Sequence, residues 1–160
     1  MRIGIHGRDS QAKTSPLIER ILKQLVDRKA DIWLSSKFIK QIKSPLLAEI
    51  KYKTFELGDN LRSLDFFFSL GGDGTMLESV TYIGKTEVPI LGINTGRLGF
   101  LAITSRDDIE VALEALFTGA YKVESRTMLR LNSSTKLFDP LNFALNDFTI
   151  MKKDTSSMIT

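Results

Sequence analysis

The chain has 160 residues, of which 42% are hydrophobic and 26% charged, a composition typical of a globular rather than a disordered protein. It contains no cysteine and a single histidine, His6, which excludes disulfides, cysteine nucleophiles and a two-histidine zinc site. The formal net charge is +3, the basic residues are spread out, and no apolar stretch reaches the ~18 residues that span a bilayer. The first residues also lack the apolar region of a signal peptide. We therefore expect a cytoplasmic protein that binds neither nucleic acid nor membrane.

The first third of the chain predicts alternating strands and helices. Residues 2–7 alternate apolar and small or polar side chains and end at glycine, which indicates a strand. Ser15 followed by Pro16 predicts the start of a helix, and apolar residues at helical spacing follow. Residues 30–34 predict a second strand. In residues 35–57 the pattern is weak and favours one helix that a Ser-Pro pair ends.

The middle of the chain gives clearer signals. Residues 64–70 (LDFFFSL) are almost continuously apolar, which is typical of a strand buried on both faces of a parallel sheet. This strand leads into GGDGT at residues 71–75, and a helix is expected next. Residues 88–93 predict another buried strand that enters a second glycine-bearing loop at residues 94–99. A helix is then expected over residues 105–117, with Ser105 near its start.

After Gly119, which we expect to cap that helix, the pattern becomes strand-like. We therefore expect two domains: an α/β domain over residues 1–119, with a mostly parallel sheet flanked by helices, and over residues 120–160 the beginning of a truncated, all-β domain. The strands expected in the second domain cover residues 122–125, 127–133 and 142–151.

The GGDGT segment is the strongest chemical signal. Glycines let a backbone approach a ligand closely, and the N–H groups at a helix start favour anions such as phosphate. Asp73, among these glycines, would repel phosphate, so it either holds Mg²⁺ or accepts hydrogen bonds from a sugar hydroxyl that attacks a phosphoryl group. A tight turn with a surface aspartate is the structural alternative. The glycines fit neither a Walker loop nor the dinucleotide fingerprint.

Three segments together resemble the NAD kinase family: GGDGTML at residues 71–77, LGINTGRLGFLA at residues 91–102 and ALNDFTI at residues 144–150. Loops like GGDGT also occur in phosphofructokinases and in diacylglycerol and sphingosine kinases, so a lipid or sugar kinase is the enzyme alternative. The second segment favours NAD kinase. The resemblance implies a phosphofructokinase-like N-terminal domain followed by the start of the family's β domain.

The resemblance implies transfer of phosphate from ATP, with Mg²⁺, to the 2′-hydroxyl of the adenosine ribose of NAD, which gives NADP. In that comparison Asp73 matches the catalytic aspartate, which contacts the ribose. An ordinary carboxylate is a weak base, so we expect positioning of the hydroxyl to matter more than capture of its proton. The further residues expected to bind substrate are Gly71, Gly72, Gly74 and Thr75 beside the phosphates, Phe100 near adenine, Asn146 and Asp147 at adenine and ribose, and Asn94, which alternatively only holds its turn.

Four further residues carry expectations. Asp147 stands where the family has Glu, one methylene longer, and Glu78 stands where many relatives have a basic residue. His6 and Arg8 lie where the first strand should end. We expect His6 to be a hydrogen-bonded strand-end residue, while Arg8 is either solvated or contacts a phosphate.

No residue cluster is expected to ligate a metal. By resemblance the full-length protein is a homo-oligomer with NAD and ATP as its small-molecule partners. The alternative from another class is a nucleotide-binding module without catalysis. Residues 1–160 alone are expected to be inactive, because the part of the family's dinucleotide site that follows is missing from them.

Overall fold

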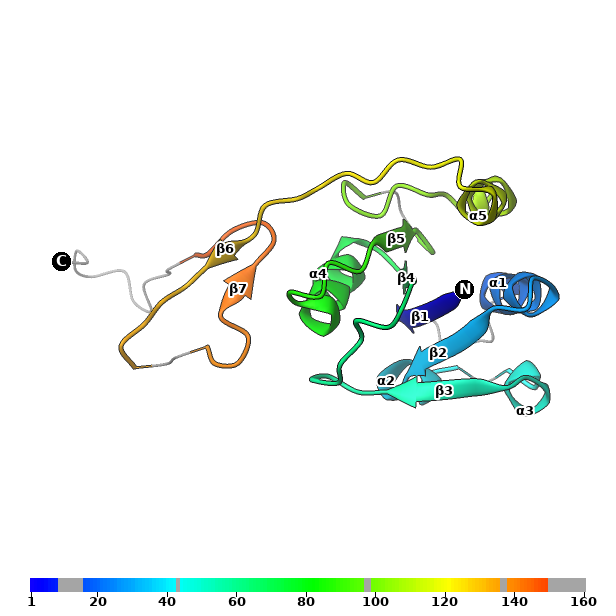
Figure 1. The fold of residues 1–160 in the computed structure, drawn as a ribbon, viewed down its shortest axis with the longest axis horizontal. Coiled ribbons are helices and arrows are strands. Elements are labelled where there is room, and N and C mark those ends of the chain that lie inside the picture. Colours follow the sequence, from blue (N-terminus) through cyan, green and yellow to red (C-terminus); the bar gives the residue numbers. More distant parts are fainter. Residues whose placement is uncertain (9–15, 43, 97–98, 136–137, 150–160) are drawn as a thin grey trace. The chain divides into compact units, whose positions relative to one another are not determined.

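The structure is a computed structural model in which two compact units, Met1–Val123 and Glu124–Thr160, are each described by themselves. The residues that it describes are 1–8, 16–42, 44–96, 99–135 and 138–149. In chain order the strands and helices (Figure 1) are β1 (Arg2–Gly7), α1 (Pro16–Asp27), β2 (Asp31–Ser35), α2 (Ser36–Ile39), α3 (Leu46–Glu49), β3 (Tyr52–Phe55), β4 (Phe66–Leu70), α4 (Asp73–Ile83), β5 (Ile90–Ile93), α5 (Ile109–Thr118), β6 (Leu129–Arg130) and β7 (Phe143–Ala144).

The first unit is built on a five-stranded parallel sheet with the strand order β3-β2-β1-β4-β5. This confirms the expected α/β class with a parallel sheet. The chain runs outward from β1 to β2 and β3, then returns to build β4 and β5 on the other side of β1. The strand order therefore reverses between β1 and β4, where Gly7 is paired with Leu70. In open α/β sheets, ligands bind outside the carboxyl ends of the strands at such a reversal.

Helices cover both faces of the sheet, α1 and α5 on one side and α4 on the other (Figure 1). The packing of Phe66, Phe67 and Phe68 explains why the sequence of β4 is continuously apolar at its start. Phe66 and Phe68 belong to the core on the α1 side, whereas Phe67 belongs to the core on the α4 side. All three are at most 8% exposed, as expected. Trp33, also expected in the core, is only partly buried on the α4 side.

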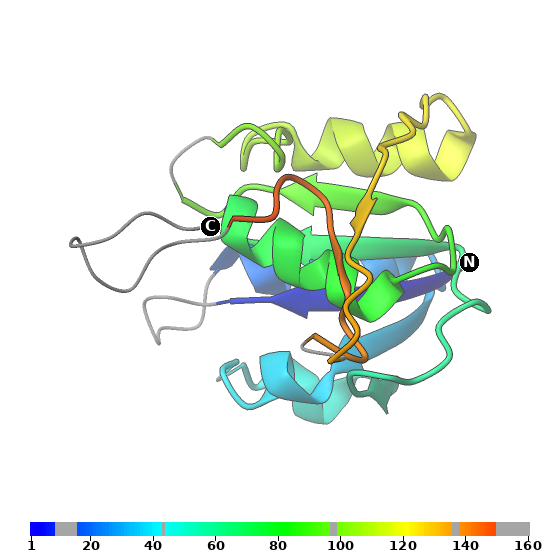
Figure 2. The ribbon, with the colours of Figure 1, turned by 90° about the vertical axis from the view of Figure 1, so that its left-hand side faces the viewer.

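The parallel strands end at the same edge of the sheet (Figure 2). Segments that follow β1, β2, β4 and β5 therefore meet there although they are far apart in the sequence. Glycines and charged residues were singled out from the sequence in the segments after β1, β4 and β5, but not in the segment after β2. The fold consequently gathers most of the predicted site at one edge.

Two stretches of the first unit differ from the sequence-based expectations. In residues 35–57 the structure has two short helices, α2 and α3, and the edge strand β3 instead of one helix. At the far end, α5 begins at Ile109 because Asp108 is its N-cap, and Ser105 Oγ donates to the Asp108 carboxylate at 2.6 Å. Gly119 ends α5 in the left-handed conformation at φ 79°, as expected. The expected cap Ser15 lies outside the described residues.

The second unit contains the antiparallel pair of β6 and β7. Residues 122–125 form no strand. Among residues 124–135 and 138–149, no side chain is buried. Within the described ranges, no helix of either unit has the length and apolar character needed to cross a membrane.

Candidate active site

The turn after β4 is shorter than the sequence suggested, because α4 begins at Asp73 with Gly72 as its N-cap. Gly74 and Thr75 therefore belong to the first helical turn rather than to a loop. The first N–H groups of a helix have no partners within the helix, and the helix dipole makes this end positive. The glycine-bearing segment thus presents an anion-binding helix start at the carboxyl edge of the sheet.

The three glycines of this segment have different structural roles. A Cβ at Gly71 would lie 2.2 Å from Thr75 Oγ1, so Gly71 lets the turn close against the Thr75 side chain, which is buried. At Gly72 and Gly74 a Cβ would meet no described atom within 4 Å. Packing does not require glycine at these two positions. Both positions leave the backbone open to close approach.

Asp73 connects the start of α4 to the segment after β5. Its Oδ1 accepts hydrogen bonds from the backbone N–H groups of Leu101 at 2.8 Å and Ala102 at 3.2 Å, and its Oδ2 accepts one from Phe100 at 2.8 Å. The hydrogen bonds from Phe100 and Leu101 hold the pKa of Asp73 below its usual value. The carboxylate is therefore ionised, fixed in orientation and a poor proton acceptor.

Gly99 completes this connection and was not singled out as a site residue from the sequence. A Cβ at Gly99 would lie 2.3 Å from Asp73 Oδ1 and 2.6 Å from its Cγ. The carboxylate can approach the backbone only because residue 99 lacks a side chain. The glycine in LGF was the available signal, but its partner, 26 residues earlier, could not be inferred from spacing.

Asn94 holds the second loop. Its side chain is 3% exposed, its Oδ1 accepts from the N–H of Gly96 at 2.8 Å, and its Nδ2 donates to the carbonyl of Ala102 at 3.4 Å. Of the two roles considered for Asn94, these contacts support the structural one. Residues 97–98 of the loop lie outside the described residues.

Phe100 has an anchored backbone and a free ring. Its N–H is bonded to Asp73, while the residue is 93% exposed. Burial of a large exposed apolar ring against a ligand lowers the free energy and therefore favours binding. This exposure is compatible with the predicted contact to an adenine.

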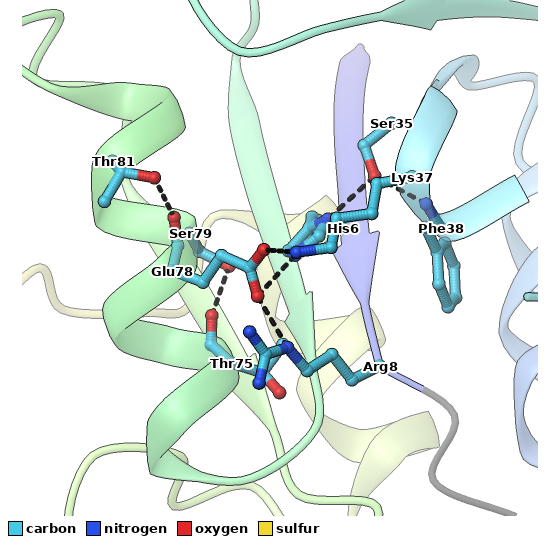
Figure 3. A network of polar contacts seen from close by, with 9 residues as sticks. All are labelled: His6, Arg8, Ser35, Lys37, Phe38, Thr75, Glu78, Ser79 and Thr81. Carbon is cyan, nitrogen blue, oxygen red and sulfur yellow. Dashed lines mark hydrogen bonds and ion pairs between the residues drawn. The ribbon is translucent and has the colours of Figure 1, made fainter. Parts of the chain in front are cut away.

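Behind the helix start, His6, Arg8, Lys37 and Glu78 form a charged cluster (Figure 3). His6 is completely buried, with Nδ1 2.7 Å from Ser35 Oγ and Nε2 3.5 Å from Glu78 Oε2. Burial lowers the pKa of His6, although Glu78 acts in the opposite direction. His6 is therefore neutral near pH 7, and its contacts confirm the expected hydrogen-bonded residue at a strand end.

Glu78 is the centre of this cluster. Its Oε2 accepts a hydrogen bond from Arg8 Nε at 2.6 Å, and its Oε1 accepts one from Lys37 Nζ. Burial acts to raise the pKa of Glu78, but the hydrogen bond from Lys37 and the charges nearby outweigh it, so the pKa is lowered. Glu78 is therefore an anion with two cationic partners. Lys37 was not singled out from the sequence, because the strand-to-helix junction before it was not recognised.

Comparison with known proteins identifies the family to which this geometry belongs. A family model described as the ATP-NAD kinase N-terminal domain matches residues 3–121. The chain belongs to this family. The chain is 40% identical to the NAD kinase of Cytophaga hutchinsonii over 161 residues, which cover all of this chain and 55% of that relative. It is 34% identical to the NAD kinase of Methanothermobacter thermautotrophicus, covering 99% of this chain and 52% of the relative.

The chain thus spans about half the length of the curated NAD kinases it matches. A solved structure supports the fold: the crystal structure of yeast NADH kinase complexed with NADH, with a TM-score of 0.62 at 21% identity. This match covers 81% of this chain and 41% of that one. The likeness shows that the two chains share the fold.

The remaining predicted NAD kinase residues, Asn146 and Asp147, follow β7 in the second unit and are exposed. The Asp147 carboxylate accepts a hydrogen bond from Thr149 Oγ1 at 2.8 Å. Their substrate contacts stay a prediction.

A metal ion held by the protein does not fit the described residues. Among them, no three or more His, Asp or Glu side chains are grouped as ligands. The Asp73 carboxylate already accepts three backbone N–H bonds, which take up most of its acceptor positions. Of the two roles considered for Asp73, its surroundings favour acceptance of a hydrogen bond from a hydroxyl.

Proposed function

We propose that the complete natural protein containing this chain phosphorylates the 2′-hydroxyl of the adenosine ribose of NAD with ATP and releases NADP and ADP. The supporting observation is the Asp73 carboxylate, fixed by three backbone N–H groups at the start of α4, beside two glycines that packing does not require. Family membership supports NAD and ATP as the substrate pair.

In this mechanism Asp73 positions the acceptor. Its carboxylate accepts a hydrogen bond from the ribose hydroxyl and turns the oxygen toward the γ-phosphorus. A new O–P bond forms while the bond between the γ-phosphorus and the bridging oxygen breaks, and ADP leaves. Because the pKa of Asp73 is lowered, the hydroxyl proton passes on to solvent rather than staying on the carboxylate.

The phosphates approach the positive end of α4, where Gly72 and Gly74 leave the backbone open. ATP brings its Mg²⁺ on its own phosphates, so the protein need not hold a separate ion. Phe100 covers the adenine of NAD, and Asn146 and Asp147 contact adenine and ribose. The proposal includes a homo-oligomer in the cytoplasm.

The first test is the activity of the complete natural protein with ATP and NAD, followed as NADP with an NADP-specific dehydrogenase. Asp73→Asn should lower kcat by about 10²-fold or more, because the carboxamide cannot hold the hydroxyl and accept all three N–H bonds. Asp31→Asn is the matched control: Asp31 is another carboxylate that accepts hydrogen bonds, from Trp33 and Lys53, but it lies at the start of β2. It should leave kcat unchanged.

Two results would contradict the proposal. Turnover only of diacylglycerol or fructose 6-phosphate would exclude NAD as the acceptor. A kcat of Asp73→Asn within a few-fold of the wild type would show that Asp73 has no part in the reaction.

A further inference from the structure

The segment that follows β4 carries no cation of its own. Residues 71–78 read GGDGTMLE, with two carboxylates and no Lys or Arg. The backbone donors at the helix start supply only part of a unit charge, whereas transfer from a nucleoside triphosphate concentrates negative charge at the reacting phosphate. Cationic side chains near this segment must therefore come from another element.

Arg8 is the first residue after β1, and its backbone N–H donates to the carbonyl of Leu70 at 3.1 Å. Leu70 ends β4 and directly precedes Gly71. Arg8 and the glycine turn therefore follow two neighbouring strands, β1 and β4, between which the strand order reverses. Lys37 lies in α2, which starts directly after β2, the next strand beyond β1. Both cations are at the carboxyl edge of the sheet.

The side chains of Arg8 and Lys37 both donate to the carboxylate of Glu78 on α4 (Figure 3). The carboxylate is largely covered, with a side-chain exposure of 15%, whereas Arg8 is 54% and Lys37 50% exposed. With His6 neutral, the cluster carries two positive charges and one negative charge. One positive charge is left after internal pairing, and it is accessible to an anion.

The sheet order indicates which anion this is. Asp73 receives the acceptor hydroxyl, and the segment that holds it, Phe100 to Ala102, lies on the β5 side of β4. Arg8 and Lys37 lie on the opposite side, after β1 and β2. An in-line transfer needs acceptor and donor on opposite sides of the moving phosphorus. The cluster is thus on the donor's side.

We propose that Arg8 and Lys37 bind the oligophosphate of the phosphoryl donor, and that Glu78 is the positioning residue that holds both cations beside the glycine turn. This inference rests on the proposed function of the same site. It assigns the donor's phosphates to side chains that lie far from GGDGT in the sequence.

The test uses Arg8→Gln and Lys37→Gln in the complete natural protein. Each should raise the KM for ATP by about tenfold, the loss expected for a charge-assisted hydrogen bond, with the KM for NAD within twofold of the wild type. Arg20→Gln and Lys53→Gln are matched controls. Arg20 is 44% and Lys53 58% exposed, and each pairs with a carboxylate. Lys53 is the second residue of β3, and Arg20 lies in α1, on the face of the sheet opposite α4. They should leave both KM values unchanged.

Glu78 is tested by two variants that separate positioning from charge. Glu78→Gln keeps one accepting oxygen but no charge, so it holds at most one of the two cations and should raise the KM for ATP less than Glu78→Ala does. Glu78→Ala releases both cations and should raise the KM for ATP about fivefold or more at unchanged KM for NAD. A purely structural role would instead lower thermal stability and kcat without a change confined to ATP.

Binding of inorganic tripolyphosphate, measured by calorimetry without NAD, separates this inference from the proposed function. Weaker binding by Arg8→Gln and Lys37→Gln than by the wild type supports the donor site even if NAD is not the acceptor. Equal binding by wild type and both variants would overturn it, as would a rise confined to the KM for NAD.

Discussion

Asp73 and Glu78 lie five residues apart on α4, and both carry lowered pKa values for different reasons. Asp73 is held by neutral N–H groups, so no cation neutralises its charge and it can still accept a hydroxyl. Glu78 is held by two cations, so its charge is used within the protein. Two carboxylates on the same helix are thus held in different ways, which is the basis for the different roles that we propose for them.

At this scale the first prediction concerns Gly99→Ala. The added Cβ would fall 2.3 Å from Asp73 Oδ1, so the carboxylate or the Phe100 backbone must shift. Displacement of a positioning group by about 1 Å costs on the order of 10²-fold in rate, and kcat should fall by 10- to 100-fold while the protein stays folded. Gly96→Ala, whose Cβ meets no described atom within 4 Å, should cost less. Equal kcat for wild type and Gly99→Ala would contradict this.

His6 provides a second residue-scale prediction, on pH. Its pKa in the fold is lowered by burial, so below about pH 6.5, the ordinary value, the unfolded chain binds a proton that the folded chain does not. Stability conferred by the neutral ring is thus complete above this pH and falls as pH decreases, by up to about 1.4 kcal/mol per unit. Glu78 titrates below its ordinary value of 4.5, outside this window.

The measurement is denaturant unfolding of wild type and His6→Asn between pH 8 and pH 5.5. Asn places an amide near the position of Nδ1 but does not titrate. The difference in unfolding free energy between the two proteins should shrink as the pH falls. A difference that stays constant across this range would show that His6 takes up its proton equally in both states.

At the scale of elements, the sequence predicted what local patterns encode. β1, β4 and β5 were found because their apolar runs end at glycine or enter glycine-bearing loops, and α1 because its apolar residues repeat at helical spacing. β3 was missed because it is an edge strand of four residues with two exposed positions, and its pairing with β2 is a long-range contact. The same holds for the site. The GGDGT motif could be recognised from the sequence, whereas the Asp73–Gly99 and Lys37–Glu78 contacts are long-range and depend on the fold.

The packing of elements gives a third prediction, from two glycines that respond oppositely to alanine. A Cβ at Gly7 would lie 2.6 Å from the Phe38 ring and 2.9 Å from the Leu70 carbonyl, so Gly7→Ala should lower the unfolding free energy by about 1–3 kcal/mol. Gly74 is exposed in α4 with no described atom near a Cβ, so Gly74→Ala should raise it by up to about 1 kcal/mol. Chemical denaturation of both variants checks the opposite signs.

At the scale of the whole molecule, burial is distributed very unevenly between the two units. Every buried residue of the described chain belongs to Met1–Val123, which contains both core clusters. The described residues of Glu124–Thr160 bury no side chain and include only two strands of two residues each. Apolar burial is the dominant stabilising contribution, so the first unit carries the stability of the chain.

The last prediction compares three proteins: residues 1–123, residues 1–160 and the complete natural protein. The first two should unfold cooperatively at similar denaturant concentrations, because residues 124–160 add no buried side chain to the described structure. Both should form NADP at no more than about a hundredth of the rate of the complete protein, because residues 1–123 lack Asn146 and Asp147, and in residues 1–160 both of these residues are exposed. Unfolding midpoints by circular dichroism and NADP formation measure the two halves of the prediction. Full turnover by residues 1–160 would mean that Asp73 and its neighbours bind NAD without further protein around them.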